Sequence, residues 1–145
     1  MTYETPTIKG TLFEDKTFSF PVRIYYEDTD AGGIVYYANY LKFAERARTE
    51  YLRHIGFNQD DLLKDKGVGF VVRECHVSYK TPAKLDDALN ITCKVTEIKG
   101  VSLKMEQKLY RDDTILSEIE ISLVFLSLPS MRPTKIPSEI ISLLQ

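Results

Sequence analysis

The chain has 145 residues, a formal net charge of -2, 43% hydrophobic residues and 28% charged residues. This length and composition indicate one globular domain over residues 1–145, with a single core and no linker. The charge argues against extensive nucleic-acid binding, and no apolar run is long enough to span a membrane. We therefore expect a cytoplasmic protein.

Residues 1–16 show no sustained period and are predicted to form a surface lead-in with at most a short strand. From Phe18 to Ile24 apolar and polar residues alternate, which predicts a half-buried strand. Pro21 within this stretch lacks an N–H and favours the edge of a sheet or the beginning of strand pairing.

An acidic, glycine-rich turn then precedes a stretch in which apolar residues recur at spacings of three and four, from Tyr40 to Ile55. This period predicts a helix of about four to five turns, with Asn39 as its N-cap and Gly56 as its C-cap. A second, short helix is predicted over 59–66, started by Asn58 and stopped by Gly67.

The rest of the chain alternates with a period of two over residues 68–79, 89–95, 101–110 and 115–128. Short turn-like breaks separate these four strands, which predicts antiparallel hairpins. The predicted fold is α+β, with one long central helix wrapped by a five-stranded or slightly larger antiparallel sheet. A ferredoxin-like arrangement would need a second long helix between the later strands. A long exposed strand edge also favours pairing with another subunit.

The junction between the acidic turn and the long helix is where we expect chemistry. The first N–H groups of a helix have no intrahelical partners, and the helix dipole favours negative charge there. Of the nearby carboxylates, Glu27 and Asp28 are expected to be solvated or structural. A carboxylate in such a glycine-rich turn can equally serve only as a cap.

Residues 22–53, VRIYYEDTDAGGIVYYANYLKFAERARTEYLR, resemble the hot-dog acyl-CoA thioesterases of the YbgC and 4-hydroxybenzoyl-CoA thioesterase group. The resemblance rests on Thr29-Asp30, Gly33, Tyr36 and Asn39-Tyr40, and it continues through FVVRECHVSYKTPAKLDD at residues 70–87. It implies a hot-dog fold and hydrolysis of an acyl-CoA, or of an acyl chain on a carrier protein, without metal or other cofactor. It also implies a homodimer or homotetramer with sites at the subunit interface.

The resemblance implies that Asp30 is the nucleophile or the general base toward water. The N–H groups around Tyr37 and Ala38 would then bind the thioester oxygen, while Gly33 allows a close approach to the backbone. YbgC-type relatives commonly have histidine where this chain has Tyr37. A phenol with an ordinary pKa of about 10 cannot act as a base at neutral pH, which leaves hydrogen bonding or a purely backbone role for Tyr37.

Further residues are candidates for binding the substrate. Tyr36 is a candidate for lining an acyl or aryl pocket, and Glu45 matches a carboxylate near the acyl end in the hydroxybenzoyl branch. The alternative for Glu45 is an ion pair with Arg48 or Lys42. Lys99 is a candidate for the CoA phosphates, with Arg73, Lys80 and Lys84 as weaker ones; any of these can be a solvated charge instead.

The two histidines, His54 and His76, are predicted to be a surface residue at the helix C-terminus and a strand residue. Both cysteines, Cys75 and Cys93, lie in strand-like segments and are predicted to be buried, inert thiols. A non-catalytic acyl-CoA-binding or scaffolding module remains the alternative function. A hot-dog dehydratase would need a histidine that this stretch lacks. The length and type of the acyl group cannot be read from one chain.

Overall fold

The computed structural model describes all residues from Met1 to Gln145. The main elements are helix α1 (Asn39–His54) and strands β2 (Phe18–Arg23), β3 (Val68–Tyr79), β4 (Ala88–Lys99), β5 (Ser102–Arg111) and β6 (Thr114–Ser127). The short elements are β1 (Thr11–Leu12), β7 (Arg132–Pro133), a 3-10 turn (Tyr26–Asp28), α2 (Gln59–Asp61), a π-helical turn (Leu62–Lys66) and α3 (Ser138–Leu144).

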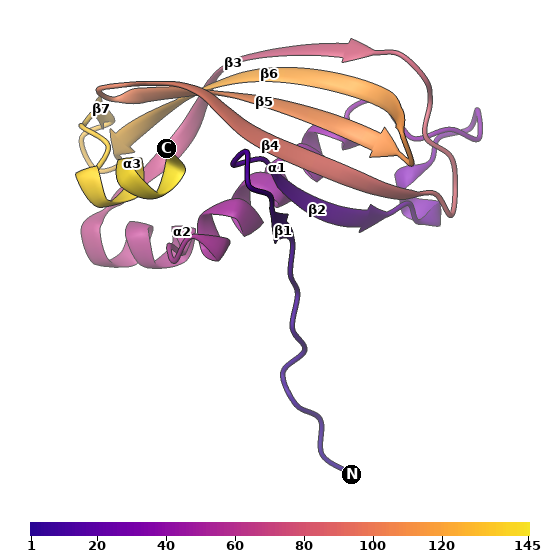
Figure 1. Cartoon of the computed structure of the whole chain (residues 1–145), viewed down its shortest axis with the longest axis horizontal. Helices are drawn as coiled ribbons and strands as arrows, with labels where there is room; N and C mark the ends of the chain where they lie inside the picture. Colours follow the sequence, from indigo (N-terminus) through magenta and orange to yellow (C-terminus); the bar gives the residue numbers. More distant parts are fainter.

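All strands belong to one antiparallel sheet in the order β1-β2-β4-β5-β6-β3, with β7 paired to β6. The sheet curls over α1, so the helix lies in its hollow (Figure 1). The predicted α+β, helix-wrapped sheet is confirmed. β1 and β7, two residues each, enlarge the five predicted strands. Pro21 follows the part of β2 that pairs with β1, so one side of its backbone lacks a strand partner, as predicted.

The core lies between α1 and the concave face of the sheet. The predicted helical stripe is buried: Phe43, Ala44 and Ala47 are fully buried, and Tyr40 and Tyr51 are at most 3% exposed. The Tyr51 ring stacks on Phe18 of β2, with ring centroids 5.2 Å apart. Burial of this stripe fixes the rotation of α1, and it therefore fixes which residues of α1 face away from the core.

The C-terminal helix α3 was not predicted from the sequence. Its Ile140 and Leu144, together with Ile136 before it, are buried against one end of the core. The predicted short helix over 59–66 is present but divided into α2 and the π-helical turn, with Asn58 accepting hydrogen bonds at its start. Gly67 ends it at φ +64°, a conformation that favours glycine.

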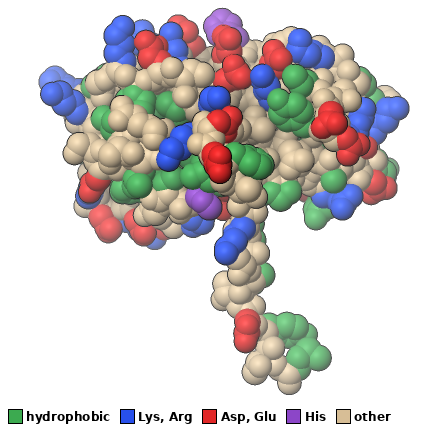
Figure 2. All heavy atoms as spheres, viewed as in Figure 1, with side chains coloured by type: hydrophobic (Ala, Val, Ile, Leu, Met, Phe, Trp, Pro, Cys, Tyr) green, Lys and Arg blue, Asp and Glu red, His purple; other side chains and the backbone are tan.

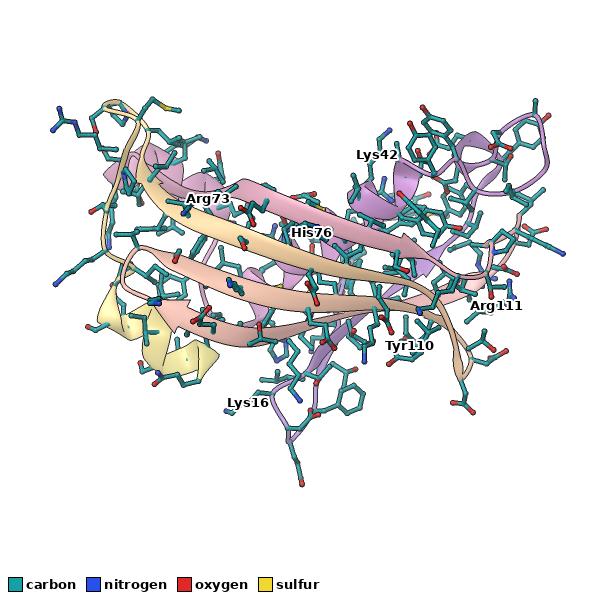
Figure 3. The ribbon with its side chains drawn as sticks, turned by 90° about the horizontal axis from the view of Figure 1, so that it is seen from above. Lys16, Lys42, Arg73, His76, Tyr110 and Arg111 are labelled. Carbon is teal, nitrogen blue, oxygen red and sulfur yellow. The ribbon has the colours of Figure 1, made fainter.

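The edge strand β3 pairs only with β6, so its other edge has no partner in the chain. Arg73 and His76 of this strand lie on the outer side of the sheet, and α1 carries Lys42 beside the same edge (Figure 3). Cys93 is buried as predicted, but the prediction for Cys75 is wrong: it is exposed, because β3 has a neighbour on one side only.

The N-terminal residues 1–9 are exposed and extend away from the body of the molecule, which carries interspersed acidic and basic side chains (Figure 2). β1 follows this extension, in agreement with the predicted short strand in the lead-in. None of the helices combines the length and the apolar character needed to cross a membrane.

Candidate active site

The acidic turn after β2 folds back on itself before it enters α1. Thr29 and Val35 pair as an antiparallel bridge, and the Asp30 N–H donates to the Ile34 carbonyl at 2.9 Å. The Gly33 N–H donates to the Asp30 carbonyl at 3.0 Å, and Gly33 adopts φ +80°, which favours a residue without Cβ. The turn therefore presents Asp30 at its tip, just before the chain reaches α1.

The Asp30 carboxylate is exposed and locally anchored. Its Oδ1 accepts a hydrogen bond from the Gly32 N–H at 2.8 Å, so the turn-capping role considered for this residue is real. No side chain or N–H donates to Oδ2. One oxygen therefore holds the carboxylate in place while the other remains available to a ligand or to water.

Asp28 is a buried carboxylate, only 5% exposed, and was expected to be solvated or structural. Its Oδ1 accepts from Asn39 Nδ2 at 3.0 Å, and its Oδ2 accepts from the Tyr25 N–H at 2.8 Å. Its carbonyl also accepts from the Tyr36 N–H at 2.9 Å. Asp28 is thus hydrogen-bonded to residues on both sides of the turn, Tyr25 and Tyr36, and to Asn39, the first residue of α1. Glu27, by contrast, is exposed as expected.

The N-cap prediction for Asn39 is wrong. Ala38 occupies the N-cap position and Asn39 is the first helical residue, because its side chain is bonded to Asp28. Neither the Tyr37 N–H nor the Ala38 N–H donates a hydrogen bond within the chain. The start of α1 therefore offers unpaired donors and the positive end of the helix dipole next to the turn that carries Asp30.

Aromatic residues surround this helix start. The Tyr37 side chain is 62% exposed, and its carbonyl accepts from the Tyr79 hydroxyl at 2.8 Å. Tyr36 is 46% exposed and packs edge-on against Tyr37, with centroids 5.0 Å apart. Tyr40 is buried, and its hydroxyl accepts from the Ala83 N–H at 3.0 Å. Tyr79, which the sequence did not single out, therefore joins the end of β3 to the helix start.

The loop before β4 supports the same region. Val35 N–H donates to the Ala83 carbonyl at 2.9 Å, and Ile34 bridges Lys84. Asp87 Oδ2 accepts from the Lys84 N–H and from Arg111 Nη1, each at 2.8 Å. Burial acts to raise the pKa of Asp87, but these hydrogen bonds and the Arg111 charge outweigh it and lower that pKa.

Glu45 lies two turns into α1, away from the acidic turn. The ion pair considered for it is absent, since neither Arg48 nor Lys42 lies within 4.0 Å of its carboxylate. Instead its Oε1 accepts from the Thr49 hydroxyl at 2.6 Å. Glu45 and Arg48 both line a cavity beneath the sheet.

The candidate phosphate-binding residues lie at different ends of the sheet. The first residue of β4, Ala88, pairs with Arg23 beside the acidic turn, whereas Lys99 ends the same strand about 36 Å further along. One chain therefore does not bring Lys99 together with Asp30. Lys84 borders the acidic turn directly through its bridge to Ile34.

The histidines and cysteines offer no activated nucleophile. His54 is exposed at the end of α1, and His76 is exposed on β3, as predicted. Burial raises the pKa of Cys93 to about 12, and partial desolvation raises the pKa of the exposed Cys75, so both thiols are protonated at neutral pH.

Comparisons with known proteins point to one family. The family model of the Thioesterase-like superfamily matches residues 24–144. The acyl-CoA thioesterase YbgC of Haemophilus influenzae is 48% identical over 126 residues, covering 87% of this chain and 93% of that protein. The acyl-CoA thioester hydrolase YbgC of Escherichia coli O6:H1 is 46% identical over 126 residues, covering 86% of this chain and 93% of that protein.

Solved structures agree with these sequence matches. A probable thioesterase from Bartonella henselae has a TM-score of 0.78 at 32% identity, covering 82% of this chain and 98% of that one. A 4-hydroxybenzoyl CoA thioesterase mutant complexed with 4-hydroxybenzoyl CoA has a TM-score of 0.84 at 22% identity, covering 89% of this chain and 99% of that one. This similarity shows that the two proteins share a fold. The resemblance read from residues 22–53 and 70–87 is thus confirmed. The chain belongs to the thioesterase-like superfamily and has its hot-dog fold.

Proposed function

We propose that this protein hydrolyses the thioester bond of an acyl-CoA, releasing a free acid and the CoA thiol. The observation that carries the proposal is the Asp30 carboxylate, presented by a fixed turn beside the unpaired N–H groups of Tyr37 and Ala38. The YbgC relatives, at 46 to 48% identity over most of the chain, support the same activity and substrate class.

Asp30 can act by two routes that give the same products. As a base it takes a proton from water while the water oxygen bonds to the thioester carbon. As a nucleophile it bonds to that carbon through a carboxylate oxygen, and water later cleaves the resulting anhydride. In both routes the carbonyl oxygen becomes an oxyanion that the N–H groups of Tyr37 and Ala38 stabilise. Collapse then breaks the C–S bond, and the thiolate leaves and is protonated.

The Tyr37 side chain has no necessary part in either route. Its hydroxyl makes no hydrogen bond in the chain and most of the side chain is exposed. We therefore assign Tyr37 a backbone role and place Tyr36, which packs against it, at the substrate entrance. Gly33, which has no side chain, allows the substrate to approach the backbone of the turn closely. Lys84, which borders the acidic turn, is our candidate for a CoA phosphate contact from within the same chain, and Lys99 is our candidate for a contact from a second subunit.

The unpaired edge of β3 is the surface on which we expect a second copy to dock, as a dimer or a tetramer. This edge is twelve residues long and exposes Val72 and Tyr79, which are 51% and 46% exposed. An edge of this length invites pairing with another strand. A cytoplasmic location and acceptance of an acyl chain on a carrier protein stay predictions.

Steady-state release of free thiol from a panel of acyl-CoAs and acyl carrier protein thioesters tests the activity. We expect Asp30→Asn to lower kcat by at least about 100-fold, as for loss of a base or nucleophile. Tyr37→Phe should stay within a few fold of wild type, and Glu27→Gln controls for loss of a neighbouring exposed carboxylate. Equal rates for Asp30→Asn and wild type would contradict the role of Asp30.

A single turnover in ¹⁸O-labelled water tests for the nucleophilic route. Label that appears in the Asp30 carboxylate indicates that route, whereas label found only in the released acid is expected both for the base route and for water attack on the acyl carbon of the anhydride. Tight binding of acyl-CoA by wild type without any thiol release would instead favour a non-catalytic acyl-CoA-binding module.

A further inference from the structure

The peptide between Tyr37 and Ala38 is held by a single hydrogen bond. Its carbonyl oxygen, on Tyr37, accepts from the Tyr79 hydroxyl at 2.8 Å and from no other group of the chain. Its N–H, on Ala38, donates to no acceptor in the chain. Leu41, whose N–H would reach the Tyr37 carbonyl in a regular α-helix, donates to the Ala38 carbonyl instead. The orientation of this peptide therefore depends on Tyr79.

The planarity of the peptide connects its two ends. In a trans peptide the C=O of Tyr37 and the N–H of Ala38 lie in one plane and point in opposite directions. A donor that fixes the direction of the carbonyl thereby also fixes the direction of the N–H. A hydrogen bond accepted by the carbonyl in addition polarises the peptide and strengthens the bond that its N–H donates. Tyr79 can thus act on a group bound at the Ala38 N–H without touching that group.

The sheet holds the backbone of Tyr79 in place. Tyr79 is the last residue of β3 and pairs with Ser117 of β6. The Ser117 hydroxyl donates to the Ser78 carbonyl at 2.9 Å, and the Lys80 N–H donates to the Leu116 carbonyl at 2.9 Å. Ser117 and Leu116 are fully buried. The residues on both sides of Tyr79 are therefore tied to the core of the molecule.

Two aromatic neighbours hold the Tyr79 ring. It packs edge-on against Tyr40, with ring centroids 5.2 Å apart, and edge-on against Tyr37, with centroids 6.2 Å apart. Tyr40 is buried and is itself fixed by the hydrogen bond from the Ala83 N–H to its hydroxyl. Packing therefore aims the Tyr79 hydroxyl at the Tyr37 carbonyl together with the hydrogen bond itself.

Burial does not force the Tyr79 hydroxyl to bond to protein. Tyr79 is 46% exposed, so water can reach its side chain, and a hydrogen bond in such a place adds little to the stability of the fold. Partial desolvation raises the pKa of Tyr79, so its hydroxyl keeps its proton and can donate at neutral pH. A bond of this kind, which orients an otherwise unpaired N–H, points to a role in what that N–H binds.

We propose that Tyr79 is a positioning residue of the oxyanion site, whose hydroxyl orients and polarises the Ala38 N–H through the Tyr37–Ala38 peptide. The inference rests on the proposed thioesterase function and deepens it by adding a residue that acts through the backbone donor. As the thioester oxygen gains negative charge, the polarised N–H stabilises it more than it stabilises the neutral carbonyl. Tyr79 therefore acts on kcat rather than on KM, and its own proton stays on the hydroxyl.

Tyr79→Phe tests this role because it removes the hydroxyl and keeps the ring contacts. We expect this variant to lower kcat for acyl-CoA hydrolysis by about 10-fold, as for the loss of one hydrogen bond, and to change KM by less than about twofold. Thermal unfolding and light scattering check that the variant keeps the fold and the mass of wild type.

Tyr110→Phe is the matched control. Tyr110 lies near the end of β5, is partly buried, and its hydroxyl makes no hydrogen bond within the chain. This variant loses the same atom as Tyr79→Phe but leaves the Tyr37–Ala38 peptide as it is. It should keep the kcat and the KM of wild type.

The infrared band of a bound carbonyl reports on the Ala38 N–H itself. The probe is a hydrolysis-resistant acyl-CoA ketone, with CH₂ in place of the thioester sulfur and ¹³C at the carbonyl. A hydrogen bond to a carbonyl oxygen lowers its stretching frequency, so the band should lie at lower frequency in wild type and Tyr110→Phe than in Tyr79→Phe. A loss of stability alone would not move this band.

Difluorotyrosine in place of Tyr79 is the second variant, used if Tyr79→Phe loses its fold or its mass. Fluorine lowers the pKa of the phenol, and a phenolate cannot donate a hydrogen bond. The kcat of this variant should therefore fall as the pH rises through the lowered phenol pKa, over a range in which wild type keeps its kcat. The same replacement of Tyr110 should leave the pH profile of wild type.

The outcomes separate this inference from the proposed function. A Tyr79→Phe variant with the kcat of wild type, a rise in KM alone, or an unchanged carbonyl band would overturn the role of Tyr79 and leave the thioesterase activity standing. Failure of wild type to release thiol from any thioester would overturn the activity instead. In that case the ketone band, compared between wild type and Tyr79→Phe, still decides whether Tyr79 acts on a carbonyl bound at the Ala38 N–H.

Discussion

Asp28 Oδ1 accepts a hydrogen bond from Asn39 Nδ2 at 3.0 Å, and this buried pair joins the acidic turn to the first residue of α1. Asp30 lies two residues after Asp28, and the unpaired N–H groups of Tyr37 and Ala38 come directly before Asn39. The pair therefore sets how far the Asp30 carboxylate is from these N–H groups. In the proposed mechanism it positions both groups without touching the substrate.

The first prediction concerns exchange of these two side chains. Asn39→Asp alone places two carboxylates against each other in a buried site, and we expect it to cost about 2 to 4 kcal/mol of unfolding free energy and most of kcat. Adding Asp28→Asn restores one carboxylate facing one amide. The double variant should therefore recover stability and kcat. Urea unfolding and thiol release measure both; a double variant no better than the single one would contradict the pairing.

Much of this region could be predicted from the sequence, and the Asp28–Asn39 pair shows where that stops. The turn, the helix and the choice of Asp30 as the candidate carboxylate have local signals: glycines, a period of 3.6 and a family motif. Asn39 follows Asp28 by eleven residues, and no local pattern pairs them, so Asn39 was predicted to be an N-cap. The same is true of Tyr79, which reaches the Tyr37 carbonyl only through the sheet.

Cys75 and α3 illustrate a second limit. The alternation that predicts a strand does not say whether the strand has one neighbour or two, and Cys75 is exposed because β3 is an edge strand. The apolar residues of α3 form too short a segment to separate a helix from a strand by period alone. In both cases the deciding information is tertiary.

A second prediction follows from Asp87, which fastens the loop that borders the acidic turn. Its pKa is lowered in the folded protein, and the unfolded value is about 3.9. A lowered carboxyl pKa contributes stability above the unfolded pKa, and this contribution is lost as the pH falls through the folded pKa. Wild type should thus exceed Asp87→Asn by about 1 to 2 kcal/mol at pH 7, with the difference shrinking below about pH 4.

Urea midpoints measured from pH 7 to pH 3 check this expectation. Asp113→Asn is the control, since Asp113 is exposed in the β5–β6 turn and makes no ion pair. That variant should follow wild type at every pH. A constant difference between wild type and Asp87→Asn across the whole range would show that the ionised carboxylate is not what holds the loop.

A third prediction concerns the unpaired edge of β3. If a second copy pairs with it, the backbone amides of residues 68–79 should exchange hydrogen for deuterium more slowly as the protein concentration rises. Amides of β5, which has strand neighbours on both sides, should not depend on concentration. Light scattering on the same samples gives the mass. A dimer whose formation leaves β3 exchange unchanged would place the interface elsewhere.

The last prediction concerns Gly33, which has φ +80° and open space, with no atom within 4 Å, where a Cβ would lie. Gly33→Ala therefore costs backbone strain without a clash, about 1 kcal/mol, and the turn relieves that strain by moving Asp30. Gly100 in the β4–β5 turn has φ +62° and equally open surroundings, but it lies at the other end of the sheet from Asp30. We expect Gly33→Ala and Gly100→Ala to lower the unfolding free energy by similar amounts, and only Gly33→Ala to lower kcat, by about 10-fold or more. Equal kcat for the two variants would show that the turn conformation does not position Asp30 for the proposed reaction.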